Sequence, residues 1–148
     1  MNLRIGYGYD VHQLADGHDL WLGGIKVPHT SGAIGHSDAD VLIHVICDAL
    51  LGAANLRDIG YHFPDTNDEY KGIDSKELLA KTVSLISEKG YKIINIDSTV
   101  CLQNPKINPY ISEMKEALSQ CMNIDTDQVS IKATTTEKLG FVGKELGI

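Results

Sequence analysis

The sequence predicts an α+β fold: a single-domain α/β sandwich in which a mixed β-sheet carries helices on one face. Two observations lead to this prediction. Segments with strand-like patterns lie near both ends of the 148-residue chain, and three segments between them have apolar residues at helical spacing. The second half has the order strand, helix, strand, which is typical of layered folds. A chain of this length has room for one ordinary domain, so residues 1–148 are expected to form one.

The first expected strand covers residues 3–9, where glycine alternates with apolar and aromatic residues, and it leads to Asp10. A short hairpin follows over residues 20–27, because two apolar triplets flank Gly23-Gly24. The chain therefore opens with extended structure that ends beside an acidic residue.

The first helix is expected to follow His36 and to extend to about Ala53. Ser37 is a good N-cap, and Asp40 three residues later completes an approximate capping box. A broad apolar stripe then repeats at helical spacing. This helix is expected to be largely buried.

Residues 57–73 are rich in turn formers and are expected to form a loop, which at this length is more often functional than idle. Asp74-Ser75 is expected to cap a helix that ends near Lys89. Two strands, at 93–100 and 129–135, then enclose a helix at 110–122. The second half of the chain is thus expected to consist of two helices and two strands.

Composition excludes several classes of protein. The net charge of −7 gives no broad positive field for nucleic acid, so bound phosphate would need local cations or helix N-termini. No apolar run is long enough to cross a bilayer. The cysteines are odd in number, widely spaced and in apolar contexts, which favours buried, reduced thiols in a cytoplasmic protein over disulfides: Cys47, Cys101 and Cys121.

Asp10-Val11-His12 is the first candidate metal motif. In an extended segment, residues two apart point to the same face, so the carboxylate and the imidazole converge while Val11 points away. Such a pair can share one divalent ion, and these donors suit zinc. Taken alone, the motif is weak, because a satisfied pair at the end of a strand is the more common explanation.

A second motif lies on the first helix, where Asp40, His44 and Asp48 are spaced four residues apart along one polar ridge. A metal-bound imidazole whose other N–H is held by a neighbouring carboxylate would account for His44 and one of these aspartates. Asp10, His12 and His44 would leave a fourth position open, as in catalytic zinc sites. The alternative is a solvated row of acidic residues.

Two further segments are candidates for binding phosphate. His36 and Ser37 precede the first helix, whose N-terminus favours anions. Thr134, Thr135 and Thr136 offer hydroxyl groups at the end of a strand, and Glu137 beside them could hold Mg²⁺. Threonine also simply favours strands, so this segment alone decides nothing.

Together these segments resemble the 2-C-methyl-D-erythritol 2,4-cyclodiphosphate synthase family. The matching runs span nearly the whole chain in the family's order: GYGYDVHQL (6–14), GHSDADVLIHVICDALLGA (35–53), DIGYHFPDT (58–66), KGIDSKELL (71–79), NPKINP (104–109) and KATTTEKLGF (132–141). No single run is decisive, but their joint occurrence at these spacings is highly specific.

The resemblance implies a homotrimer with active sites between subunits, one Zn²⁺ per site, and Mg²⁺ or Mn²⁺. It implies a cytidine diphosphate-linked substrate, 4-diphosphocytidyl-2-C-methyl-D-erythritol 2-phosphate, which is cyclised with release of CMP by a phosphorus–oxygen lyase. This is a step of the non-mevalonate (MEP) pathway to isoprenoid precursors. The substrate's 2-phosphate is itself the nucleophile, so the protein has to fold one anion back on itself and stabilise the transferred group.

Residue by residue, the resemblance implies Asp10, His12 and His44 as zinc ligands and Glu137 as the magnesium ligand. His36 and Thr135 fall on the positions that stabilise the transition state. The implied substrate-binding residues are Asp10, Val11, His12, His36, Ser37, Asp58, Ile59, Gly60, Phe63, Pro64, Asp65, Thr66, Asn67, Leu102, Gln103, Asn104, Pro105, Lys106, Ile107, Asn108, Thr134, Thr135, Thr136, Glu137, Phe141 and Lys144.

Two departures from the family pattern and one rival function complete the prediction. Lys144 stands where relatives often carry arginine, and lysine lacks the bidentate fork that suits phosphate. The sequence stops at Ile148, where relatives continue through one more strand, so that strand is expected to be absent. The rival is a zinc-dependent phosphohydrolase or phosphodiesterase, which would use the same ligands to activate water.

Overall fold

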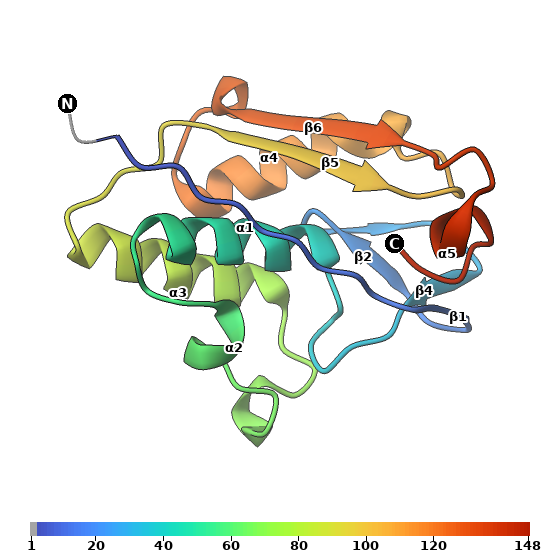
Figure 1. The fold of residues 1–148 in the computed structure, drawn as a ribbon, viewed down its shortest axis with the longest axis horizontal. Coiled ribbons are helices and arrows are strands. Elements are labelled where there is room, and N and C mark those ends of the chain that lie inside the picture. The colour runs from blue at the N-terminus through green and yellow to red at the C-terminus, as the bar shows by residue number, and fades with distance from the viewer. Residues whose placement is uncertain (1–2) are drawn as a thin grey trace.

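The computed structural model describes residues 3–148 and contains three long helices beside a parallel pair of strands (Figure 1). The strands are β5 (Ile96–Cys101) and β6 (Val129–Thr134), and α4 (Ile111–Met122) packs against β6. Helices α1 (Val41–Ala53) and α3 (Ser75–Glu88) lie side by side on the same side of the strands, and α1 contacts β5. The predicted α+β class and the three predicted helices are confirmed.

The strands pair in twos. In the register of β5 and β6, Ile96 is opposite Val129, and the two strands run parallel. Two short antiparallel pairs form at the other end of the molecule: β1 (Leu14–Asp16) with β4 (Ser31–Ala33), and β2 (Leu20–Leu22) with β3 (Ile25–Val27). Over residues 3–148 these are three separate two-stranded sheets, so the prediction of one continuous mixed sheet was wrong.

The β5–β6 pair has one buried face and one exposed face. Val100, Val129 and Ile131 are buried, whereas Asp97 and Lys132 point to solvent and form an ion pair at 2.6 Å. Because the side chains of a strand alternate between faces, the helices cover only the first of these faces. The prediction that helices cover one face of the sheet is therefore confirmed for the β5–β6 pair.

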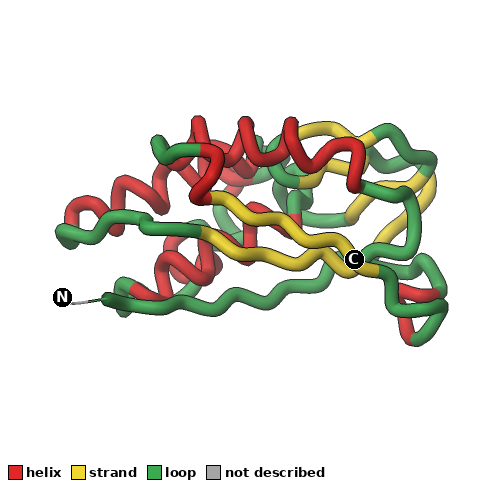
Figure 2. The backbone as a smooth tube through the Cα atoms, turned by 90° about the horizontal axis from the view of Figure 1, so that it is seen from above, coloured by secondary structure: helices red, strands yellow, loops and turns green. Residues whose placement is uncertain are grey.

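The segment 3–9 is not a strand, although its alternation predicted one. It is extended and runs beside α1, but within the described chain it has no ladder partner (Figures 1 and 2). Gly6 and Gly8 face the helix so closely that an added Cβ would lie 1.7 Å from the Ala49 carbonyl oxygen and 2.0 Å from that of Val45. Glycine therefore serves close packing on α1 here, and pairing in a sheet does not explain it.

Helix α1 begins later than the sequence predicted, and its N-cap is Asp40. The Asp40 side chain accepts the N–H of Ile43, while Ser37 accepts the N–H of Ala39 in a local turn. The expected capping box led by Ser37 was therefore wrong. Asp74 caps α3 as predicted, by accepting the N–H of Lys76.

The segment 57–73 is mostly loop, as predicted, but it includes the four-residue helix α2 (Ile59–His62) and the 3-10 turn η1 (Asp68–Tyr70). Two more 3-10 turns, η2 (Asn108–Tyr110) and η3 (Thr126–Gln128), flank α4. The short helix α5 (Gly140–Gly143) lies near the end of the chain. None of the helices in the described part of the chain has the length and apolar character of a membrane span.

The cysteines differ in exposure. Cys47 is buried, Cys121 is half-buried, and Cys101 is exposed at the end of β5. All three are free thiols, as predicted. The expectation that all are buried was wrong for Cys101, because its strand position faces solvent while Val100 beside it faces the core.

Candidate metal site and active-site pocket

Three side chains from two segments meet at one point. Asp10 and His12 lie on the extended segment before β1, and His44 lies in the first turn of α1. One ligand atom of each side chain lies within 4.8 Å of the others. Nε2 of His12 is 2.9 Å from Oδ2 of Asp10, and Nδ1 of His44 is 3.4 Å from the same oxygen.

The packing of the two segments explains this convergence. Gly6 and Gly8 allow the extended segment to lie directly on α1, and the alternation of the segment then turns Asp10 and His12 to one side. His44 is half-buried on the first turn of the helix, facing the same point. The i, i+2 argument from the sequence therefore predicted how this pair would be arranged.

The charge of Asp10 is favoured in this cluster. Burial by itself raises its pKa, but the hydrogen bonds with His12 and with the backbone N–H of Val11 outweigh this effect, so that the pKa lies well below its usual range. An ionised carboxylate and two imidazole nitrogens form a donor set that suits zinc. The residues present thus fit the ion that the sequence predicted.

The other ring nitrogen of His44 faces hydroxyl groups. Its Nε2 atom lies 3.0 Å from Oγ of Ser37 and 3.1 Å from Oγ of Ser75, at the start of α3. Ser75 in turn donates its hydroxyl hydrogen to Asp38. Sequence reasoning missed Ser75 and Asp38, because residues 37 positions apart give no local pattern.

The acidic ridge predicted on α1 has a structural role instead. Asp40 is fully buried and accepts the N–H groups of Gly23 and Gly24 at the β2–β3 turn as well as that of Ile43. Burial raises the pKa of Asp40, against the effect of these backbone donors. Asp48 accepts the N–H of Ile59 at 2.8 Å. Neither aspartate holds His44, and neither belongs to a solvated row of acids.

A pocket of about 460 Å³ opens beside the metal cluster. Nε2 of His36 is buried there and has no hydrogen-bond partner among the described residues. Nine predicted site residues line the pocket: Val11, His12, His36, Ser37, His44, Ile59, Gly60, Phe63 and Asp65. Six lining residues were not predicted: Gln13, Ile34, Gly35, Tyr70, Ile73 and Leu78.

The predicted site residues of segments 102–108 and 134–144 form a second group, beyond the ends of β5 and β6. Four other predicted residues lie in the segment 57–73 outside the pocket lining: Asp58, Pro64, Thr66 and Asn67. The N–H of Leu102 donates to the Thr134 carbonyl at 2.9 Å, and Gln103 accepts the N–H of Lys138. The Thr135 hydroxyl donates to Glu137 at 2.9 Å. No residue of 102–108 or 134–144 is among those that line the pocket. The structure thus brings segments 102–108 and 134–137 together, but apart from the pocket lining.

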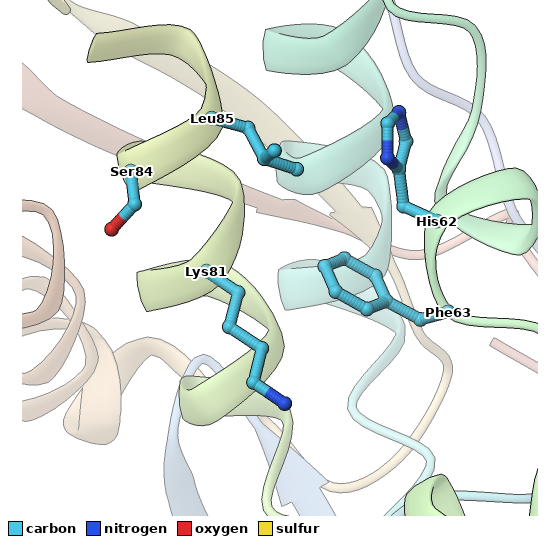
Figure 3. Close-up of a pocket in the computed structure, with 5 residues that line it drawn as sticks. All are labelled: His62, Phe63, Lys81, Ser84 and Leu85. Atoms are coloured by element: carbon cyan, nitrogen blue, oxygen red, sulfur yellow. The ribbon is translucent and has the colours of Figure 1, made fainter. Parts of the chain in front are cut away.

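A separate hollow of about 340 Å³ lies between α3 and the C-terminal end of α2. Figure 3 shows His62 and Phe63 on one side of it and Lys81 and Leu85 of α3 on the other. Nε2 of His62 lies 2.6 Å from the Leu56 carbonyl oxygen, so this contact ties the side chain to the backbone before α2. His18 and His29 are exposed.

Comparison with known proteins gives the same family throughout. A family model described as the YgbB family matches residues 3–148. The 2-C-methyl-D-erythritol 2,4-cyclodiphosphate synthase of Phocaeicola vulgatus is 65% identical over 148 residues, which is 100% of this chain and 92% of that protein. The synthase of Bacteroides thetaiotaomicron is 62% identical over 100% of this chain and 93% of that protein.

Solved structures agree with these sequence matches. The bifunctional IspDF of Campylobacter jejuni has a TM-score of 0.93 at 41% identity, covering 97% of this chain and 39% of that one. A 2C-methyl-D-erythritol-2,4-cyclodiphosphate synthase in a CDP-bound form has a TM-score of 0.87 at 37% identity, covering 92% of this chain and 91% of that one.

Proposed function

Because the chain belongs to the YgbB family, we propose that its pocket folds back 4-diphosphocytidyl-2-C-methyl-D-erythritol 2-phosphate for ring closure. The function is that of the 2-C-methyl-D-erythritol 2,4-cyclodiphosphate synthases, in the MEP pathway of isoprenoid biosynthesis. The observation that carries this conclusion is identity of 62–65% over the whole chain to synthases of this name. We assign residues 1–148 to one synthase domain.

In the proposed reaction, an oxygen of the 2-phosphate attacks the β-phosphorus, and the bond from that phosphorus to the oxygen of the α-phosphate breaks. The electron pair leaves with CMP, so no water and no protein nucleophile take part. The protein has to hold the two ends of the substrate in line. Phosphohydrolase activity is not favoured, because the relatives are synthases.

We assign His36 and Thr135 to the transferred phosphoryl group. The unpartnered Nε2 atom of His36 is buried at the pocket, where it can hydrogen-bond a phosphoryl oxygen. The Thr135 hydroxyl is bonded to Glu137 and can turn to a phosphate oxygen instead. Donors fixed in advance toward developing charge typically contribute ~10²–10³ in rate.

We assign Asp10, His12 and His44 to Zn²⁺ and Glu137 to Mg²⁺ or Mn²⁺. Bound there, the two ions would act as Lewis acids that offset the repulsion between the phosphate groups. The acidic chain has a net charge of −7 and cannot offset this repulsion by its overall field. The carboxylate of Glu137 is exposed, as suits a hard cation that takes its other ligands from phosphate and water.

We assign the segments 58–60 and 63–67 to the erythritol and its phosphates, and residues 102–108 to cytidine. Phe141 and Lys144 would complete the diphosphate contacts with Thr134 and Thr136. Phe63 and Asp65 line the pocket, which supports the first assignment. The relative solved with CDP bound supports a cytidine diphosphate-linked substrate.

We propose that the chain forms a homotrimer with active sites between subunits. Leu3, Ile5, Tyr7 and Tyr9 all point to one side of the extended segment and are 63–88% exposed. Such a contiguous apolar patch marks an interface. Docking on it would let segments 102–108 and 134–137 of one subunit complete the pocket of the next. The free thiols fit a cytoplasmic location, which we include in the proposal.

Phosphorus NMR of the purified protein with the cytidylyl substrate and Mg²⁺ tests the function. We expect stoichiometric CMP and a cyclic diphosphate, and no incorporation of ¹⁸O from the solvent. Incorporation of solvent ¹⁸O into a released phosphate would instead establish hydrolysis. A tightly held diphosphate without CMP release would indicate a binding protein.

A further inference from the structure

A chain of hydrogen bonds behind the metal cluster ends on His44. Nε2 of His44 lies 3.1 Å from Oγ of Ser75, and that hydroxyl lies 2.5 Å from Oδ1 of Asp38. Ser75 is fully buried at the first position of α3. Asp38 and His44 lie close together in the sequence around the start of α1, whereas Ser75 begins α3, so the tertiary fold brings Ser75 between them.

The direction of each hydrogen bond follows from the number of protons. The Ser75 hydroxyl has one hydrogen, and an ionised carboxylate can only accept, so this hydrogen goes to Asp38. The Ser75 oxygen is therefore an acceptor toward His44, and His44 must donate from Nε2. A neutral imidazole carries one N–H, so its Nδ1 atom keeps a free lone pair. That atom is the one that faces Asp10 and His12.

Asp38 is fixed firmly enough to impose this arrangement. Its second oxygen, Oδ2, accepts the backbone N–H of Ser75 at 3.0 Å. The carboxylate therefore accepts hydrogen bonds from both the hydroxyl and the backbone N–H of Ser75. The backbone N–H of Asp38 donates to the Ile73 carbonyl at 3.1 Å. The segment before α1 and the start of α3 are thus joined by both side-chain and backbone hydrogen bonds of Asp38.

Ser37 fits the same scheme. Its oxygen accepts the N–H of Ala39 and lies 3.0 Å from Nε2 of His44 and 3.4 Å from Oγ of Ser75. With an N–H on His44, the Ser37 hydroxyl can donate its hydrogen to Ser75, and every group has a partner. His12 differs, because its Nδ1 atom is buried with no partner among residues 3–148.

We infer that Ser75 and Asp38 are positioning residues that fix the Nε2–H tautomer of His44 and so present Nδ1 to the metal. This inference deepens the proposed function, because it rests on Asp10, His12 and His44 being the metal ligands. Hydrogen-bond partners behind a ligating histidine typically account for ~10–100-fold in metal affinity. Neither residue touches the ion or the substrate in this assignment.

Zinc affinity tests the inference. Competition with a chromophoric chelator should show ~10–100-fold weaker Zn²⁺ binding in Ser75→Ala and in Asp38→Asn than in the unmodified protein. Ser84→Ala is the matched control, because Ser84 lies on the same helix and bonds only to the Ala80 carbonyl. Its Zn²⁺ affinity should be unchanged. Affinity within twofold of the unmodified protein in both Ser75→Ala and Asp38→Asn would overturn the inference.

The imidazole ¹⁵N signals of the metal-free protein give a second, independent readout. At a pH where His44 is neutral, we expect its Nε2 to carry the proton in the unmodified protein, and both tautomers to be populated in Ser75→Ala. If Ser75→Ala does not fold, Asp38→Asn carries the same comparison. Predominant Nδ1–H in the unmodified protein would refute the inference. Tight Zn²⁺ binding without cyclisation would overturn the proposed function and leave this inference standing.

Discussion

Nε2 of His12 and Nδ1 of His44 face each other at 3.3 Å, although the two residues are 32 positions apart in the chain. The rings present chemically different nitrogens to a common point, with their centroids 5.0 Å apart. Two such nitrogens with an ionised carboxylate beside them form a donor set that one cation can join. This pair is therefore the geometric centre of the candidate site.

Replacing His44 with alanine should abolish zinc binding and turnover together. The variant removes one of three ligands, and the remaining Asp10 and His12 cannot hold the ion alone at ordinary concentrations. Metal analysis and CMP release measure the two effects. His29→Ala is the control, because His29 is exposed and lies outside the site. Full zinc in a folded but inactive His44→Ala protein would contradict the ligand assignment.

The arrangement of this site was predictable only where it depends on local geometry. Asp10 and His12 point the same way because they are two apart in an extended segment, and that much follows from the sequence. Ser75 and Asp38 meet through the packing of α1 against α3, which no spacing encodes. Residue type and local spacing predicted the candidate ligands, and tertiary packing determines their hydrogen-bond partners.

Two errors in the fold prediction have one physical origin. The alternation of glycine with large apolar residues at 3–9 resembles a strand, but Gly6 and Gly8 serve the contact with α1. Asp40 was expected to support a cap led by Ser37, but its carboxylate is needed by Gly23 and Gly24, far away in the sequence. In both cases a distant backbone determined what the residue does.

Asp40→Ala should destabilise the protein without removing zinc. The change leaves the buried N–H groups of Gly23, Gly24 and Ile43 without an acceptor, at a cost of about 3–5 kcal/mol in the free energy of unfolding. Asp48→Ala loses one hydrogen bond, to Ile59, and should cost about 1 kcal/mol. Urea unfolding and zinc analysis at a temperature where both variants are folded measure the two properties. Loss of zinc from folded Asp40→Ala would contradict the purely structural role of Asp40 and indicate that it supports the metal site.

Lys106→Ala should raise KM for the cytidylyl substrate and spare zinc content. Lys106 is exposed in segment 102–108, which we assign to cytidine, and it lies outside the pocket lining. An exposed cation near a nucleotide diphosphate contributes to binding in the ground state, so kcat should change less than KM. Lys89→Ala, an exposed lysine after α3, is the control. An unchanged KM would exclude a nucleotide role for Lys106.

Ile5→Lys should dissociate the proposed trimer. Ile5 is 88% exposed in the apolar row on segment 3–9, and a charge buried in an interface without a partner is strongly unfavourable. Ile94→Lys is the matched control, since Ile94 is 62% exposed and lies outside that row. Sedimentation should give monomers for Ile5→Lys only, with loss of turnover because the pocket is then incomplete. Trimers in both variants would place the interface elsewhere.

Cys47 should resist alkylation in the folded protein, whereas Cys101 should react. Burial raises the pKa of the Cys47 thiol to about 12, against the opposing effect of Thr82. Because the thiolate is the reactive form, a pKa about 3 units above its ordinary value lowers the reactive fraction at pH 8 by about 1,000-fold, in addition to the barrier of burial.

Between pH 7 and 9, peptide mass spectrometry after iodoacetamide treatment should find Cys101 labelled and Cys47 unlabelled. In urea the Cys47 pKa returns to its ordinary range, so its labelling should rise with pH and level off above that range. Equal labelling of Cys47 and Cys101 without urea would show that α1 opens at this position.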